Sequence, residues 1–258
     1  MTGFPALSAL VGTEVTGFLL VFARLGAALM LLPGFGELYV PSRIRLLLAL
    51  AVTAALAPVL LPHLGPVPDA TGPLLAMVAG ETVSGLVLGA FFRILLVAVH
   101  LGGAVMATQS GLAAAAFFDP HDGAQGSIGA AFMTLAGLAV LFATDAHHAL
   151  LLALADSYAA LPAGAVGLAL DRIDLLVVQL GTATAAGLRI AAPVVVLSLL
   201  LAALFGVLGR LVPALQALFL LAPVQLLLSL LVVMGGLAAG LATFLELVGG
   251  AVRRLAGG

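Results

Sequence analysis

The sequence contains no cysteine, so this chain can form neither disulfides nor thiolate metal sites. Charged residues are also scarce, because they make up only 8% of the 258 residues and lysine is absent. A soluble domain typically carries about 25% charged residues, so this chain cannot cover itself with a hydrated surface. The net charge of −2 gives no reason to expect a nucleic acid as a partner.

Apolar residues fill most of the sequence. They account for 64% of it, and the mean hydropathy is +1.32. The apolar runs do not alternate and are far longer than the roughly ten-residue strands of a membrane β-barrel. The first fifteen residues lack a basic stretch and include Glu14, so we expect no cleavable signal peptide. The composition predicts an integral membrane protein of the helical class.

Prolines and charges divide the chain into apolar runs. These runs cover residues 15–32, 44–61, 74–118, 128–144, 175–209 and 214–248, and a shorter helix ends at Pro162. A bilayer crossing needs about 20 helical residues, so the third and fifth runs are too long for one crossing. The third is expected to break at Gly102-Gly103 and the fifth to kink at Pro193. Alternatively, both helices extend beyond the bilayer and bury their apolar faces against protein.

Three arginines, Arg24, Arg93 and Arg189, lie inside apolar runs rather than at their ends. A central arginine costs about 2.5–3.5 kcal/mol on membrane-insertion scales. We therefore expect these helices to pack against protein, with carboxylates as partners, although long side chains can also snorkel to an interface. The candidate carboxylates are Glu14, Glu81, Asp145 and Asp156, and the sequence does not assign the pairs.

Small residues recur at helical spacing in three places: Gly85-x3-Gly89, Gly236-x3-Gly240 and 113–116. In lipid, helices associate through close backbone packing rather than through a hydrophobic driving force. These positions predict close helix approaches, within the chain or between subunits.

One short polar cluster, Asp145 with His147 and His148, has the residue types of a metal or proton-relay site. A metal needs three or four convergent ligands, and the other histidines have no zinc-enzyme spacing. We therefore expect a hydrogen-bonded helix start with Asp145 as its N-cap, and no metal site. The sequence has no nucleotide-binding loop and no catalytic motif, so neither a cofactor nor a catalytic residue is expected.

The segment 109–127, QSGLAAAAFFDPHDGAQGS, interrupts the apolar pattern. Small residues lead into Phe117 and Phe118, and the run stops at Asp119-Pro120. Irregular backbone at membrane depth is tolerated only where it is buried in protein or lines a cavity. The segment therefore predicts a re-entrant element whose rings close a pore by excluding water, or else an ordinary interhelical loop with two interfacial phenylalanines.

The order of these motifs resembles the family of the flagellar biosynthetic protein FliR and its counterparts in virulence type III secretion. The matching positions are Arg24, Pro33, Pro41, Arg43, Arg45 and Pro58, then Glu81, Gly85 and Gly89, the segment QSGLAAAAFFDP, the segment HHALLLALADSYAALPAG, and finally Arg210, Pro213, Phe219 and Pro223. Each element alone is weak, but the ordered set covers nearly the whole chain.

The resemblance implies an all-α membrane protein with long helical hairpins and a re-entrant plug loop. A FliP-like portion, residues 1–173, would precede a FliQ-like helical hairpin, residues 174–258. The plug residues carried over are Gln109, Gly111, Leu112, Phe117, Phe118, Asp119 and Pro120. Arg24, Glu81, Arg93 and Arg189 are expected to be buried helix charges, and Pro41, Arg43 and Arg45 to form a family-motif loop.

The implied role is that of a non-enzymatic subunit of a flagellar protein export gate in the bacterial inner membrane, at the basal body. The implied partners are FliP, FliQ, FlhB, FlhA, unfolded secreted substrates and membrane lipid. A virulence secretion subunit is the alternative. Less favoured are an independent secondary transporter, which predicts an inverted repeat that the sequence lacks, and a metalloenzyme using Asp145, His147 and His148.

Overall fold

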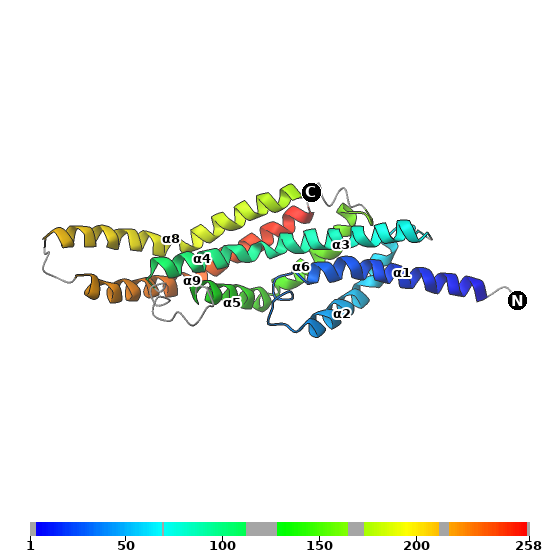
Figure 1. The fold of residues 1–258 in the computed structure, drawn as a ribbon, viewed down its shortest axis with the longest axis horizontal. Helices are drawn as coiled ribbons and strands as arrows, with labels where there is room; N and C mark the ends of the chain where they lie inside the picture. Colours follow the sequence, from blue (N-terminus) through cyan, green and yellow to red (C-terminus); the bar gives the residue numbers. More distant parts are fainter. Residues whose placement is uncertain (1–3, 69, 112–127, 165–172, 212–216, 257–258) are drawn as a thin grey trace. The chain divides into compact units, whose positions relative to one another are not determined.

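A computed structural model of the chain describes residues 4–68, 70–111, 128–164, 173–211 and 217–256 (Figure 1). Within these ranges every regular element is a helix, which confirms the predicted helical class. The elements are α1 (Phe4–Leu29), α2 (Ser42–Leu60), the 3-10 turn η1 (Leu61–His63), α3 (Thr71–Arg93), α4 (Leu95–Gln109), α5 (Ile128–Ala143), α6 (Ala146–Ala160), α8 (Ile173–Leu211) and α9 (Ala217–Ala256).

Four stretches of the described chain are long and apolar enough to cross a membrane. They are Ser42–His63, Thr71–Gln109, Ile173–Arg210 and Pro223–Leu255, and a fifth is added if α5 and α6 are counted as one broken span. The second stretch has 39 residues and combines α3 with α4. This is about twice the roughly 20 helical residues that one bilayer crossing needs.

The break within residues 71–109 lies at Ile94, so the prediction of a break at Gly102-Gly103 is wrong. Helix α4 runs straight through both glycines because they serve packing instead. A Cβ atom on Gly102 would lie 3.1 Å from the carbonyl oxygen of Gly187 on α8, and one on Gly103 would collide with the backbone of Gly129 on α5. These glycines let helices touch.

The chain divides into two compact units. The first comprises Met1–Ile94, Asp145–Gln179 and Gly249–Gly258, and the second comprises Leu95–Thr144 and Leu180–Val248. The units therefore interleave along the sequence. The division into a FliP-like portion, 1–173, and a FliQ-like hairpin, 174–258, stays a prediction.

In the first unit α1 packs against α3 and α2 (Figure 1). Leu20, Leu25 and Phe92 are fully or almost fully buried there. The Gly85-x3-Gly89 motif lies at the α1–α3 contact, where a Cβ on Gly89 would be 2.7 Å from the carbonyl oxygen of Ala28. The predicted close approach at this motif is confirmed.

In the second unit α4 packs against α5, and the two helices approach most closely at glycines. A Cβ atom on Gly129 would lie 2.5 Å from the carbonyl oxygen of Gly103. Of the other predicted motif, Gly240 contacts Ile190 of α8, whereas a Cβ on Gly236 would meet open space. The alanine run 113–116 lies outside the described residues.

Candidate functional site

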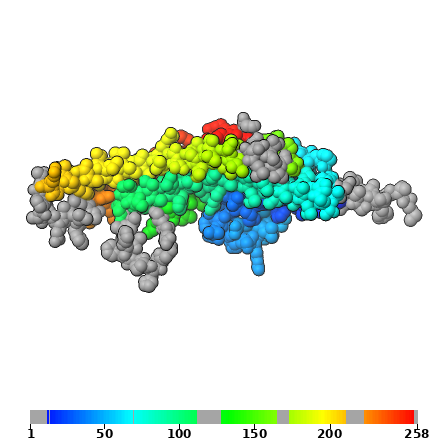
Figure 2. Space-filling view, turned by 45° about the horizontal axis from the view of Figure 1, so that its top comes forward, coloured from blue at the N-terminus to red at the C-terminus, as the bar shows by residue number. Residues whose placement is uncertain are grey.

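The longest helices leave their apolar side chains uncovered. In the most apolar 18-residue stretch of each helix, only 28% of the residues of α8 and 11% of those of α9 are buried within the chain. Leu227, Leu231 and Met234 on α9 are each more than 60% exposed. Figure 2 shows α8, in yellow, forming an extended part of the molecular surface. Surfaces of this size and character mark contacts with lipid or with other proteins.

A buried ion pair joins α1 and α3 in the first unit. Arg24 donates from Nε to Glu81 Oε2 at 2.8 Å and from Nη2 to Glu81 Oε1 at 2.9 Å, and both side chains are 0% exposed. This two-point geometry is the strong form of an arginine–carboxylate contact. Gly85 lies one turn beyond Glu81 and admits the backbone of Arg24, because a side chain there would collide with the carbonyl group of Arg24.

The end of α6 completes this ion pair. The Nη1 group of Arg24 donates to the carbonyl oxygen of Leu161 at 2.9 Å, and the backbone N–H of Gly164 donates to Glu81 Oε1 at 2.9 Å. Pro162 follows the last turn, and Gly164 has a φ of 79°, a left-handed conformation that suits glycine. The L-P-x-G motif thus supplies an acceptor for the cation and a donor for the anion.

The face of Tyr158 also covers the guanidinium group, with Arg24 Cζ 3.9 Å from the ring centroid. A cation over an aromatic face is attracted by the ring quadrupole. Removing one partner of a buried, hydrogen-bonded pair leaves an uncompensated charge, which is strongly destabilising. The Arg24–Glu81 pair therefore locks α1, α3 and the end of α6 together.

The other two predicted helix charges, Arg93 and Arg189, are more exposed to solvent than Arg24 and Glu81. Arg93 pairs with Glu37 through both terminal nitrogens, and its side chain is 41% exposed. Partial burial and the Glu37 carboxylate raise the pKa of the neighbouring Tyr39, while Arg93 lowers it. Arg189 is exposed on α8 of this single chain, so its burial stays a prediction about an assembly.

The family-motif loop lies at the start of α2. Pro41 is the N-cap, with a φ of −55°, and its carbonyl oxygen accepts a hydrogen bond from the N–H of Arg45. Arg43 is exposed and Arg45 is half-buried, both in the first turn of the helix. Cations near a helix N-terminus oppose the helix dipole, so their position does not serve the stability of α2.

Gln109, the first of the predicted plug residues, ties α4 to α8 and α9 in the second unit. Its Oε1 atom accepts a hydrogen bond from Ser198 at 2.9 Å, and its backbone oxygen accepts one from Gln225 at 2.7 Å. Gly111 ends the helix with a φ of 82°. The remaining plug residues, Leu112, Phe117, Phe118, Asp119 and Pro120, lie outside the described residues.

An apolar groove of about 390 Å³ lies beside Gln109 in the second unit, between parts of α4, α5 and α9. Met106, Met133 and Met234 line it, and Ser110 and Ser229 are its polar members. Methionine side chains are flexible and polarisable, so they adapt to partners of different shape. Ser110 and Ile128 line it as well, and they lie just before and just after the segment 112–127.

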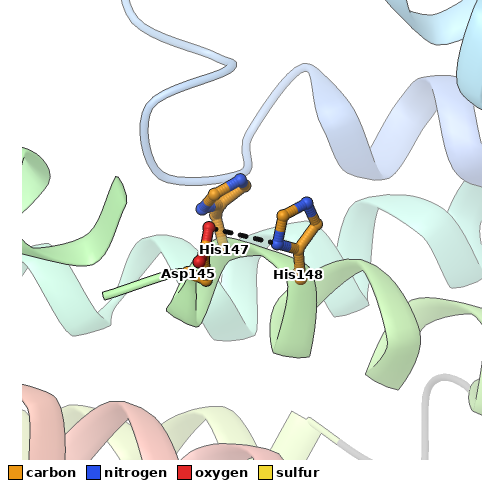
Figure 3. Close-up of side chains that lie close together, drawn as sticks. All are labelled: Asp145, His147 and His148. Atoms are coloured by element: carbon orange, nitrogen blue, oxygen red, sulfur yellow. Dashed lines mark ion pairs between the residues drawn. The ribbon is translucent and has the colours of Figure 1, made fainter. Parts of the chain in front are cut away.

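Asp145, His147 and His148 lie together at the start of α6 (Figure 3). Asp145 is the N-cap residue, as predicted, and its carbonyl oxygen accepts a hydrogen bond from the N–H of His148 at 3.0 Å, but its side chain makes no capping hydrogen bond. The backbone of Asp145 has a φ of 56° instead of the extended conformation that N-caps usually adopt. Its carboxylate lies 3.5 Å from the Nδ1 atom of His148.

The sequence did not predict that Glu37 pairs with Arg93, or that Ser198 and Gln225 donate hydrogen bonds to Gln109. For Gln225 a signal exists, since an amide inside a long apolar run implies a polar partner nearby. Glu37 lies in the polar turn before α2, and no sequence pattern favours it over the other carboxylates as the partner of an arginine.

These features together define a helical membrane protein whose long apolar helices leave much of their surface uncovered within the chain. Residues 15–251 match the model of the family described as bacterial export proteins, family 1, and the chain belongs to that family. It is also 34% identical over 211 residues to the flagellar biosynthetic protein FliR of Caulobacter vibrioides. That match covers 82% of this chain and 84% of the relative, and it confirms the resemblance seen in the sequence motifs.

Proposed function

We propose that the chain is a non-enzymatic subunit of the flagellar type III protein export gate. In this role it forms part of the export channel with FliP and FliQ, close to FlhB and FlhA, in the inner membrane at the flagellar basal body. Membership of the export family and the similarity to FliR support this proposal.

One structural observation carries the proposal. The α8 stretch of 38 residues is about 57 Å long, yet the hydrocarbon core is only about 30 Å thick. Much of this stretch, and of the α9 stretch, is apolar and uncovered within the chain. Lipid cannot cover such helices along their whole length, so protein partners must cover the rest.

The segment 109–127 acts as the plug of the channel in this proposal. Gln109 anchors its first residue to α8 and α9, so the segment starts from a fixed point. Closure is steric and apolar, through Phe117 and Phe118, and opening displaces the segment. Unfolded substrates then pass through the channel.

Co-purification tests the subunit assignment. The chain carrying an affinity tag is expressed with the FliP and FliQ proteins of the same cell and purified in mild detergent. We expect a stable complex containing all three proteins, and low yield and stability of the chain expressed alone. A stable monomer or homodimer that leaves FliP and FliQ behind would contradict the proposal.

Solute permeability tests the plug. Deleting residues 114–118 is expected to make cells leak small solutes while secretion partly persists. Unchanged permeability in an assembled complex would count against the plug.

Deletion of the gene distinguishes the flagellar assignment from the virulence alternative. The flagellar assignment predicts loss of secretion of flagellar proteins, rather than of virulence effectors.

A further inference from the structure

We infer, contrary to the expectation from the sequence, that Asp145, His147 and His148 form a binding site for a divalent transition metal ion of the Zn²⁺ type. The inference does not depend on the export role. Each residue offers one ligand atom, and these atoms all lie within 4.8 Å of one another (Figure 3). The three residues fall within four consecutive positions, so the site is built by the first turn of α6 alone.

The distances suit a tetrahedral ion. Zinc bonds to histidine nitrogen and carboxylate oxygen are about 2.0–2.2 Å long, so two ligands of one tetrahedral ion lie about 3.3–3.5 Å apart. Asp145 Oδ1 and His148 Nδ1 are separated by 3.5 Å. The ring of His147 lies against that of His148, with 4.0 Å between the centroids, and the ligand atom of His147 lies within 4.8 Å of the other two.

The backbone of Asp145 supports a role beyond starting a helix. Among the described residues it is the one non-glycine residue with a positive φ, a conformation that L-residues adopt at an energetic cost. The carboxylate makes no capping bond to α6 and lies by the imidazole of His148 instead. Unusual backbone conformations persist where the surroundings or a ligand require them.

The ligand types select the class of ion. Two imidazoles and one carboxylate are the ligands of zinc and neighbouring transition metals, whereas Ca²⁺ and Mg²⁺ prefer oxygen ligands alone. Asp145 and His148 are largely exposed, at 77% and 64%, so the ion enters freely from solvent and keeps a fourth position for water. A bound ion would brace the start of α6 immediately after the break that separates it from α5.

Metal titration of the full chain tests this inference. The protein is purified in detergent, freed of any polyhistidine tag, stripped with a chelator and titrated with Zn²⁺ alone by calorimetry. We expect one ion per chain. The double variant His147→Gln/His148→Gln should lose this ion, and the control His63→Gln, which removes an exposed histidine of η1, should keep it.

The variant Asp145→Asn tests the carboxylate separately. Asparagine tolerates the left-handed backbone as well as aspartate does, so the fold of the turn is kept while the charge is lost. We expect Zn²⁺ affinity to fall at least about tenfold. Substituting Co²⁺ into the wild-type protein gives a test that needs no variant, because a tetrahedral site produces intense visible absorption. Absence of Zn²⁺ uptake, equal uptake by the double variant, unchanged affinity of Asp145→Asn, or only weak octahedral Co²⁺ bands would each overturn the inference.

Discussion

Breaking the Arg24–Glu81 pair without removing its arginine is the sharpest perturbation of the first unit. In Glu81→Gln the amide oxygen can still accept the N–H of Gly164, but the guanidinium group of Arg24 keeps its charge at 0% exposure. Leaving a buried charge without its partner typically costs about 3–5 kcal/mol. We expect a loss of that size in the free energy of unfolding.

The chain contains its own control for this experiment. Glu37→Gln breaks a second arginine–glutamate pair of the first unit and likewise leaves the arginine, whose side chain is 41% exposed while that of Glu37 is 10% exposed. Because water reaches this arginine, we expect a loss close to the range of about 0–1 kcal/mol that exposed pairs contribute. The ratio between the two losses therefore measures the effect of burial rather than the effect of removing any ion pair.

A double substitution completes the test. In Arg24→Met/Glu81→Leu no buried charge remains, and apolar replacement of a buried pair is often close to neutral. The carbonyl group of Leu161 and the N–H of Gly164 lose their partners, which costs about 1–3 kcal/mol for each unsatisfied group. The double variant should therefore lose less stability than the separate losses of Arg24→Met and Glu81→Leu add up to.

Unfolding of the full chain, purified in mild detergent with the proteins that co-purify, is followed by circular dichroism against denaturant. Equal losses in Glu81→Gln and Glu37→Gln would refute the reasoning. So would strictly additive losses in the double variant, because additivity means that Arg24 and Glu81 do not interact.

Three further predictions use the same purified protein. Gly89→Ala should destabilise by about 1–3 kcal/mol, because its Cβ atom would lie 2.7 Å from a backbone oxygen of α1, whereas Gly72→Ala on the same helix meets open space and should be neutral or stabilising; equal effects would contradict the close α1–α3 approach. Gln225→Leu should cost about 0.5–1.5 kcal/mol and increase protease cleavage after Gln109, and unchanged cleavage would argue against the anchor. Ultraviolet titration of the Tyr158→Phe protein should show Tyr39 ionising at a higher pH than a free tyrosine, since its pKa is raised, and ionisation at or below the pH of free tyrosine would contradict this.

Much of the helical architecture could be predicted because prolines and polar turns mark its limits. The runs predicted at 44–61 and 128–144 correspond to α2 and α5 within one or two residues. The break expected at Gly102-Gly103 in the run 74–118 is wrong, because a glycine pair is compatible both with a helix break and with a packing surface. Only the neighbours Gly129 and Gly187 decide between the two, and they are distant in sequence.

The candidate sites were harder to predict than the helices. Glu81 was one of four carboxylates offered to three arginines, and choosing it required the register of α1 against α3, which Gly85 sets. The anchor of Gln109 joins residues 89 and 116 positions away, so no local pattern reveals it. The sequence correctly predicts Asp145 as the N-cap of α6, but it does not show the left-handed backbone at this residue.

We expect protein, rather than lipid alone, to cover the apolar faces of α8 and α9. Photoreactive amino acids placed at the exposed positions Leu199 and Leu227, in cells that assemble flagella, test it directly. We predict that illumination joins the chain at one or both positions to other proteins of the export gate. Adducts with lipid alone at both positions, in cells that secrete normally, would contradict the account.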